Sequence, residues 1–259
     1  MAEPPFVRLA VDGAVATVTV DRPEKLNVLT LEMLDELSRI ATQLDADRSL
    51  RCAILTGAGE RAFCVGADVL AWSPLDPLDM WRIWIKRGHQ VFEQWARLHV
   101  PVIAAINGHA LGGGLELAAA ADIRVATAAA TFGLPEASIG TVPGWSGTQR
   151  LTKLLGASRV KYLALTGRRI DAEEAYRIGL LAEPPGANAL GQAHAIAADI
   201  CRLAPVAVQL AKQLVDAGSG EGSAAALEAI ASGLAAGTHD AREGKESFAR
   251  KRAAQFEGH

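Results

Sequence analysis

The sequence is poor in the residues that build disulfide frameworks and metal sites. Its 259 residues include three cysteines, Cys52, Cys64 and Cys201. Their number is odd, none belongs to a CxxC pair, and no cysteine and histidine cluster has the spacing of metal ligands. The pattern predicts buried, apolar thiols in a reducing compartment and no metal site.

A basic excess and a long apolar run are also missing. The formal net charge is −3, so no basic field is available to hold nucleic acid. The longest apolar candidate, residues 100–126, is interrupted by Asn107, Glu116 and Asp122 before it reaches the ~20 residues that span a bilayer. The first ten residues lack the basic and apolar parts of a signal peptide. We therefore expect a soluble, cytoplasmic protein without nucleic-acid or membrane partners.

Strand and helix patterns alternate in the first half of the chain. Residues 6–20 alternate in polarity around an Asp-Gly pair at 12–13 and predict a hairpin, and Thr30 has the position of a helix N-cap. Strands are expected at 52–57, 101–108 and 123–127, and helices at 31–45, 77–98 and 111–122. From Ser146 onward strand signals stop, and successive helices follow. The unit of strand, strand and helix is compatible with a stacked spiral.

A stripe of large apolar residues marks the helix expected at 77–98. Its members are Trp81, Trp84, Ile85, Gly88, Val91, Phe92 and Trp95. Such a stripe can form the wall of a ligand site or a face of the core. The core is the favoured interpretation.

The stretch LGGGLE at 111–116 places three glycines beside a lone carboxyl group. Glycines at the start of a helix leave backbone N–H groups open to a negative charge, such as a phosphate or an oxyanion. Gly113 and Glu116 are three residues apart and share one face of a helix. The pattern suits chemistry at a carbonyl group. Close helix packing, with Glu116 in an ion pair, is the alternative.

Two further stretches have a similar character. Residues 132–151 hold Glu136 in apolar, glycine-lined surroundings, and burial would raise its pKa toward that of a proton shuttle. Glu136 could equally be a charge at a helix N-terminus. The stretch FCVGADV at 63–69 would expose backbone N–H groups in the manner of Gly113, and Asp68 is expected to cap the turn that follows.

Together these stretches resemble the crotonase superfamily, the enoyl-CoA hydratase/isomerase family. The matching segments are 22–29, 53–69, 101–126, 132–151 and 165–180, with the basic C-terminal helix. The resemblance implies an α/β fold, a spiral of ββα turns followed by a C-terminal helical trimerisation region. The expected division is a spiral core at 1–195 with the acyl-CoA site and a helical region at 196–259.

The resemblance also implies an active site. The N–H groups of Ala67 and Gly113 would form the oxyanion hole for a thioester carbonyl, and Glu116 and Glu136 would manage the water that adds to an enoyl-CoA. Residues expected to line the site are Gly66, Asp68, Gly112, Gly144 and Trp145. Residues expected to contact CoA are Arg22, Lys25, Leu26, Ala67 and Lys251.

The implied activity is reversible hydration of a trans-2-enoyl-CoA to a 3-hydroxyacyl-CoA. No cofactor beyond the CoA of the substrate is implied, and a homotrimer or homohexamer is expected. Three features depart from the family pattern: Leu70 replaces a common lysine, the segment 231–240 lacks an aromatic residue that often packs near the adenine, and Trp145 replaces a small residue. If Trp145 points inward, long straight acyl chains are disfavoured; if outward, it only packs. Isomerase, thioester hydrolase or an unusual hydratase therefore stay open, while acyl-CoA binding without catalysis and RNA binding are disfavoured.

Overall fold

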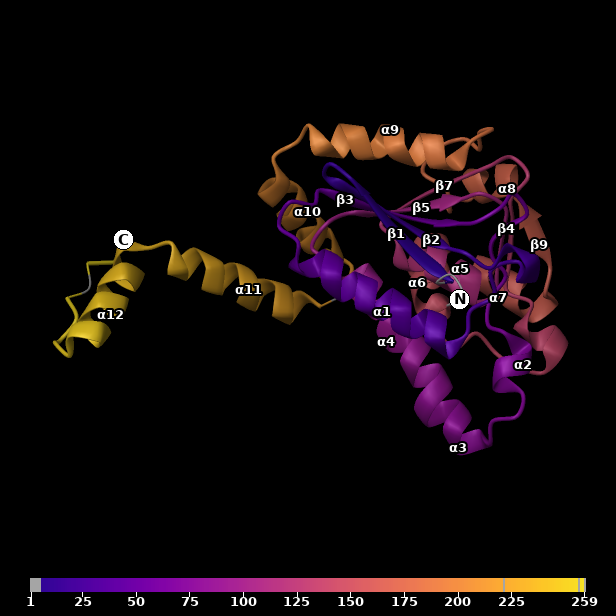
Figure 1. Ribbon diagram of the computed structural model, residues 1–259, viewed down its shortest axis with the longest axis horizontal. Helices are drawn as coiled ribbons and strands as arrows, with labels where there is room; N and C mark the ends of the chain where they lie inside the picture. Colours follow the sequence, from indigo (N-terminus) through magenta and orange to yellow (C-terminus); the bar gives the residue numbers. More distant parts are fainter. Residues whose placement is uncertain (1–5, 221, 256, 259) are drawn as a thin grey trace, which may run out of the picture. The chain divides into compact units, whose positions relative to one another are not determined.

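A computed structural model describes residues 6–220, 222–255 and 257–258. The chain forms two compact units, Met1–Val208 and Gln209–His259. Figure 1 follows the elements from the N-terminus to the C-terminus. The functional division expected at 195/196 stays a prediction.

The first sheet has five strands in the order β1-β2-β3-β5-β7. Its strands are β1 (Val7–Asp12), β2 (Val15–Val20), β3 (Cys52–Gly57), β5 (Val102–Ile106) and β7 (Ile123–Ala126). The predicted hairpin is confirmed: β1 and β2 are antiparallel, and Gly13 adopts φ +56° in the turn. The other strands run parallel to β2, and β3 and β5 are buried throughout.

The second sheet has four short strands in the order β4-β6-β8-β9. They are β4 (Ala62–Cys64), β6 (His109–Leu111), β8 (Thr131–Gly133) and β9 (Arg169–Asp171). The first three are parallel, and β9 is antiparallel to β8. Consecutive strands alternate between the sheets, so that β3, β5 and β7 lie in one sheet and β4, β6 and β8 in the other. Each turn of chain adds one strand to each sheet, which confirms the predicted spiral.

The strand prediction was wrong in its short members. β9 contradicts the expectation that strands end before Ser146, β4 and β8 lie in stretches with no predicted strand, and β6 overlaps the start of the helix expected at 111–122. A three-residue strand is too short to display alternation. It forms because a neighbouring strand, parallel for β4, β6 and β8 and antiparallel for β9, supplies its hydrogen bonds.

The helical elements of the first unit follow the predicted order. They are η1 (Pro23–Lys25), α1 (Leu31–Ala46), α2 (Val69–Trp72), α3 (Pro77–Asp79), η2 (Met80–Ile85), α4 (Lys86–Ala96), α5 (Gly113–Ala120), η3 (Glu136–Ile139), α6 (Gly147–Leu155), α7 (Ala157–Thr166), α8 (Ala172–Arg177) and α9 (Ala189–Cys201), and α10 (Pro205–Gly218) crosses into the second unit. The Thr30 hydroxyl caps α1 by accepting from the N–H of Met33, as predicted.

Helix α9 covers one face of the first sheet (Figure 1). Its Ala189, Ala193 and Ala197 pack with Ile54 and Ile103 of the sheet. Within the described part of the chain, no single helix is long and apolar enough to cross a membrane. The pair α9 and α10 qualifies by length and composition, but it bends by 111°.

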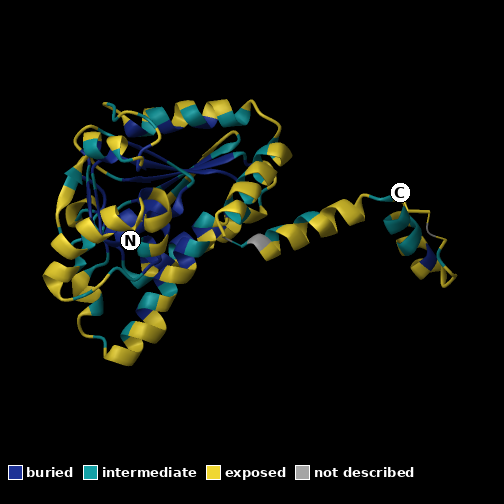
Figure 2. Ribbon diagram, turned by 180° about the vertical axis from the view of Figure 1, so that it is seen from behind, coloured by how far each residue is buried: buried dark blue, intermediate teal, exposed yellow. Residues whose placement is uncertain are grey.

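Helix α5 lies in the main core, on which α4 and α6 pack. All eight of its residues are buried, including Glu116, and the interior around it is dark blue in Figure 2. Because every residue of α5 is buried, a charge on this helix is removed from bulk water and needs hydrogen-bond partners within the protein.

The helix expected at 77–98 contains a π-helical segment, η2. A π-helical turn holds more residues than an α-helical turn, so it rotates the residues before it relative to those after it. Trp84, Phe92 and Trp95 are buried, whereas Trp81 is 65% exposed. Trp81 therefore does not belong to the predicted apolar stripe.

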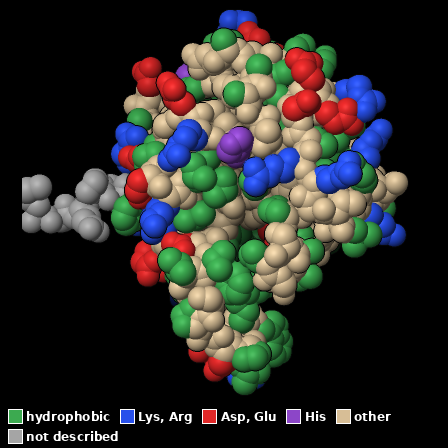
Figure 3. All heavy atoms as spheres, turned by 90° about the vertical axis from the view of Figure 1, so that its right-hand side faces the viewer, with side chains coloured by type: hydrophobic (Ala, Val, Ile, Leu, Met, Phe, Trp, Pro, Cys, Tyr) green, Lys and Arg blue, Asp and Glu red, His purple; other side chains and the backbone are tan. Residues whose placement is uncertain are grey.

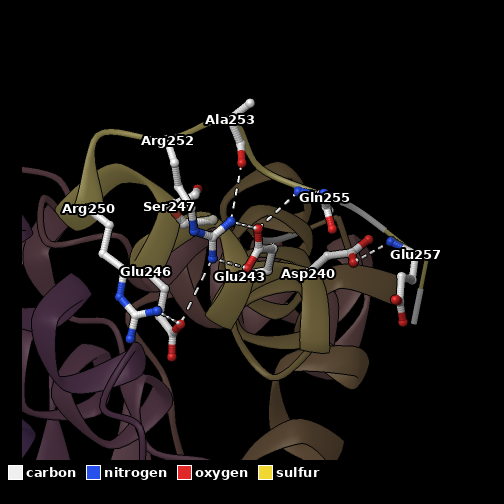
Figure 4. Close-up of polar contacts among 10 residues, drawn as sticks. Asp240, Glu243, Glu246, Ser247, Arg250, Arg252, Ala253, Gln255 and Glu257 are labelled. Atoms are coloured by element: carbon white, nitrogen blue, oxygen red, sulfur yellow. Dashed lines mark hydrogen bonds and ion pairs between the residues drawn. The ribbon is translucent and has the colours of Figure 1, made fainter.

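The second unit contains the end of α10, α11 (Ser223–Ala236) and α12 (His239–Arg250), as the helical pattern predicted. Figure 4 shows how the chain after α12 is tied back to this helix. The Arg252 guanidinium pairs with Glu243 at 2.5 and 2.7 Å, and the N–H of Gln255 donates to Glu243 at 2.9 Å. These contacts hold the pKa of Glu243 near 2.

Candidate active site

Three of the expected site segments follow the carboxyl ends of neighbouring parallel strands. Gly66 and Ala67 follow β4, Gly112 and Gly113 follow β6, and Glu136 follows β8. Carboxyl ends of parallel strands meet at one edge of a sheet, where crevices form. One cavity of about 140 Å³ opens there, with room for more than a single water. It is lined by Gly66, Ala67, Gly112, Gly113, Glu116, Glu136, Gly144 and Trp145.

The backbone N–H groups of Ala67 and Gly113 are open donors at this cavity. Leu29 pairs with the chain on both sides of Ala67, donating to the carbonyl of Gly66 and accepting from the N–H of Asp68, each at 2.8 Å. Gly113 is the first residue of α5, where a helix leaves its N–H groups unpaired. In the described part of the chain, no backbone acceptor takes the N–H of Ala67 or Gly113.

The glycines before Glu116 are required by close approach and by backbone conformation. Gly112 has φ +53° and ψ −128°, which a residue with a Cβ atom rarely adopts. A Cβ on Gly112 would lie 3.0 Å from Oε1 of Glu136, and one on Gly113 would lie 2.7 Å from the ring of Trp145. Side chains at either position would separate the groups that the cavity brings together.

The Glu116 carboxyl group is held by backbone donors. Its Oε1 accepts from the N–H of Trp145 at 2.9 Å and of Gly147 at 2.8 Å. Burial raises the pKa of Glu116, whereas these N–H groups and the charge of Arg150 act in the opposite direction. No ion pair of Glu116 occurs in the described part of the chain, so the ion-pair alternative is not observed.

The Glu136 carboxyl group lies in a different environment. Both of its oxygens are buried, and neither has a hydrogen-bond partner in the described part of the chain. Burial raises the pKa of Glu136 to about 7, and the charge of Glu116 adds to this rise. Glu136 is the first residue of the short helix η3, but its carboxyl group is directed at the cavity, where Oε1 approaches Gly112.

Trp145 points inward. It is 2% exposed, and its ring lies 5.8 Å from the ring of Trp84 and 5.3 Å from that of Phe92, between centroids. Trp84 and Ile85 line the cavity as well, so the predicted stripe forms both a face of the core and part of the cavity wall. The apolar wall also includes residues that the sequence did not single out, among them Trp72 and Met80 before α4, Ile139 at the end of η3, and Val142 after it.

The rim of the cavity is apolar and exposed. Val69 and Val142 line the cavity and are 42% and 73% exposed. Leu70, which follows Val69 in α2, is 79% exposed. Figure 3 shows hydrophobic side chains gathered over the lower part of this face, where α2 and α3 lie. The entrance therefore suits an apolar group better than an anion.

The expectation that Asp68 lines the site is not met. Asp68 is absent from the cavity wall, and its carboxylate pairs with the Arg22 guanidinium at 2.7 Å and caps α2 by accepting from the N–H of Leu70 at 3.1 Å. Burial raises the pKa of Asp68, but the Arg22 guanidinium and the N–H of Leu70 outweigh burial and hold this pKa below its usual value. The capping role expected for Asp68 is confirmed.

The remaining candidates for CoA contact lie on two segments. Lys25 is exposed, and Leu26 adopts φ +53°. Both lie in the loop before Leu29, which forms a parallel β-bridge with Ala67. Leu26 and Arg61 line a second cavity of about 210 Å³ beside this loop. Lys251 lies in the second unit, where it ends α12 with φ +52°.

A family model described as Enoyl-CoA hydratase/isomerase matches residues 10–259. The chain belongs to this family. It is 40% identical to a short-chain-enoyl-CoA hydratase of Clostridium acetobutylicum over 95% of each chain. It is also 36% identical to an (E)-benzylidenesuccinyl-CoA hydratase of Thauera aromatica over 97% of this chain and 99% of that one.

Solved structures agree with this assignment. An enoyl-CoA hydratase from Bacillus anthracis superposes with a TM-score of 0.80 at 36% identity, covering 98% of this chain and all of that one. The α/β crotonase fold with two mixed sheets and C-terminal helices is thereby established for this chain. Membership of the family implies an acyl-CoA substrate.

Proposed function

We propose that the protein is an enoyl-CoA hydratase that adds water reversibly across the 2,3 double bond of a trans-2-enoyl-CoA. The observation that carries the proposal is the meeting of two carboxyl groups and two open backbone N–H groups in one cavity. The 40% identity to a short-chain-enoyl-CoA hydratase supports it. A double-bond isomerase would need a single carboxyl group to carry a proton, so the presence of both favours a hydratase.

In the proposed mechanism the thioester oxygen of the substrate accepts from the N–H groups of Ala67 and Gly113. Glu116 takes a proton from water while the water oxygen bonds to C3. The electron pair of the double bond moves into a thioester enolate, whose oxygen charge the two N–H groups stabilise. A proton from Glu136 then adds to C2, and the enolate returns to a thioester. Proton exchange with water restores the two carboxyl groups.

Different surroundings support these separate roles. Two N–H donors stabilise the ionised form of Glu116, which suits a base. Glu136 has no such donors in the described part of the chain, and its pKa of about 7 keeps a proton available near neutrality. Pairs of carboxyl groups with different environments commonly divide acid and base roles in this way.

We further propose that the acyl group is short. The inward ring of Trp145, backed by Trp84 and Phe92, supports a cavity closed against long straight chains. Arg22, Lys25, Leu26 and Ala67 are proposed to contact CoA, together with Lys251 from the C-terminal helix of a neighbouring subunit. The exposed Lys25 is the best placed of the loop cations for a phosphate because Arg22 is paired with Asp68. A homotrimer or homohexamer in the cytoplasm is the proposed working state.

The test is hydration of crotonyl-CoA, followed by loss of the conjugated enoyl-thioester absorbance. Wild type should consume the substrate, and Glu116→Gln and Glu136→Gln should each lower kcat by about 10²- to 10⁴-fold, the usual contribution of a general acid or base. No reaction by a folded wild type that binds CoA would reject short-chain hydration. Retention of 3-enoyl-CoA isomerisation by Glu116→Gln, with no hydration by wild type, would favour the isomerase instead.

A further inference from the structure

The turn that holds Glu116 contains a residue in a costly conformation. The two donors to Glu116, Trp145 and Gly147, flank Ser146, which has φ +72°. Consecutive N–H groups around a left-handed residue form a concave anion site, a nest. The left-handed conformation costs a residue with a Cβ atom about 1–2 kcal/mol. Contacts elsewhere must therefore hold Ser146 in place.

Helix α4 supplies two such contacts. A hydrogen bond joins Nδ1 of His89 to Oγ of Ser146, and the carboxylate of Glu93 pairs with the guanidinium of Arg150. His89 and Glu93 are four residues apart on α4, and Ser146 and Arg150 are four residues apart at the start of α6. The two contacts are thus one turn apart on both helices. They fasten the turn and the first part of α6 to α4.

Arg150 depends on Glu93. Its side chain is 8% exposed, and in the described part of the chain its Nε and Nη1 atoms have no hydrogen-bond partner. A buried cation that loses its carboxylate is strongly destabilised. Arg150 also lowers the pKa of Glu116 through its charge, so its position bears on the base as well as on the fold.

Other charged and titratable groups near Glu116 are engaged elsewhere or already accounted for. Glu136 of η3 shares the cavity, and its pKa responds to the charge of Glu116. On the strands against which α5 packs, the Cys64 thiol contacts the Gly66 backbone, and the His109 ring contacts Thr131. Neither His89 nor Glu93 belongs to the cavity wall, so neither is placed to touch the substrate.

We propose that His89 and Glu93 are positioning residues for Glu116. Acting through Ser146 and Arg150, they hold the 144–147 turn so that the N–H groups of Trp145 and Gly147 stay directed at the Glu116 carboxylate. The proposal rests on the proposed hydration at this site. When the turn relaxes, the ionised form of Glu116 loses stabilisation and its pKa rises. The base weakens, whereas the contacts to CoA are unchanged.

The test compares His89→Ala and Glu93→Gln with wild type in crotonyl-CoA hydration between pH 5 and 9. We expect kcat to fall about tenfold or more, as small misplacements of catalytic groups do, with KM within about twofold. The acidic limb of the kcat profile should move to higher pH. Gln retains an oxygen acceptor for Arg150 but not the negative charge, so circular dichroism and CoA binding check that the Glu93 variant is folded, and His89→Ala tests the proposal without removing the charge.

Arg97→Ala is the matched control. Arg97, the C-cap of α4, also contacts the Glu93 carboxylate, but in the described part of the chain it makes no hydrogen bond or ion pair with α6. It should leave kcat and the pH profile unchanged. An unmoved acidic limb in folded His89→Ala and Glu93→Gln, or an equal effect of Arg97→Ala, would overturn the proposal.

Ser146 variants separate the side-chain contact from the backbone conformation. Ser146→Gly and Ser146→Ala both lose the hydroxyl group, but glycine adopts the left-handed conformation without cost. Both should lower kcat, alanine more than glycine, and adding His89→Ala to Ser146→Ala should cost no more than either change alone. Additive losses would contradict the proposed contact. Absence of hydration by wild type would instead count against the proposed function itself.

Discussion

The indole ring of Trp145 lies edge-on to the ring of Phe92, with centroids 5.3 Å apart and planes at 76°. Phe92 supports the ring from behind but is not part of the cavity wall, whereas Trp145 is. Trp145 therefore shapes the cavity directly, and Phe92 acts on it only through the ring that it supports.

Trp145→Leu should broaden the range of acyl chains. Leucine retains apolar contact but opens space beside Gly113. Hydration of an eight-carbon relative to a four-carbon enoyl-CoA should therefore rise about tenfold or more. This magnitude follows from the roughly 1–3 kcal/mol that one methylene group contributes when a pocket accepts or rejects it. The measurement is kcat/KM for both substrates. Phe92→Leu is the control: it should destabilise the fold and change this ratio less than Trp145→Leu, because the indole ring that lines the cavity is retained. An unchanged ratio in Trp145→Leu would mean that another wall limits the chain.

Glu136 should make the folded protein less stable as pH rises. Its pKa is raised from 4.5 to about 7 on folding. A raised carboxyl pKa contributes stability that is complete below pH 4.5 and lost as pH rises through 7. The loss is about 3 kcal/mol by proton linkage. Urea unfolding at pH 5 and pH 8.5 should therefore show wild type losing more stability than Glu136→Gln, and parallel losses in the two proteins would contradict the raised pKa.

Gly113→Ala should damage the oxyanion hole through Trp145. The added Cβ would lie 2.7 Å from the indole ring, so the ring or the backbone of Gly113 must move. Loss of one oxyanion donor costs about 10²- to 10³-fold in kcat. Combining the change with Trp145→Leu removes the obstruction and should recover part of the loss. No recovery in the double variant would mean that the Cβ disturbs the substrate directly.

Asn27→Ala should weaken both the fold and the binding of CoA. Asn27 is fully buried with φ +59°, accepts from the N–H of Arg22 at 2.9 Å, and donates to the carbonyls of Ala58 and Ala62. Three hydrogen bonds at about 1 kcal/mol each predict that the free energy of unfolding falls by about 3 kcal/mol. Thermal unfolding measures this loss. Because the 22–26 loop loses its anchor, KM for the acyl-CoA should rise more than kcat falls, and the reverse pattern would remove this loop from CoA binding.

Much of the fold was predictable because its longer elements carry strong local signals. The hairpin around Gly13, the capped helix after Thr30 and the strands β3 and β5 have enough residues to display a period. Strands β4, β8 and β9 do not, because each has only three residues. Length, rather than composition, separates the two sets.

The candidate site divides in a similar way. Glu116 and Glu136 were identifiable as lone carboxyl groups in apolar stretches, and the structure brings them to one cavity. The inward direction of Trp145 depends on Trp84 and Phe92, which only packing brings near. The left-handed Ser146 and its link to His89 leave no local signal, since serine seldom adopts that conformation.

The alternation of consecutive strands between two sheets has a consequence for how the chemistry can vary. Each spiral turn ends one short strand at the same edge and delivers its own share of the cavity: the N–H of Ala67 after β4, the N–H of Gly113 and the Glu116 carboxyl group after β6, and the Glu136 carboxyl group and the 144–147 turn after β8. The roles are therefore modular. A change confined to one loop can replace one role while the scaffold and the other two contributions persist, so a chain of this architecture can acquire a new reaction one loop at a time.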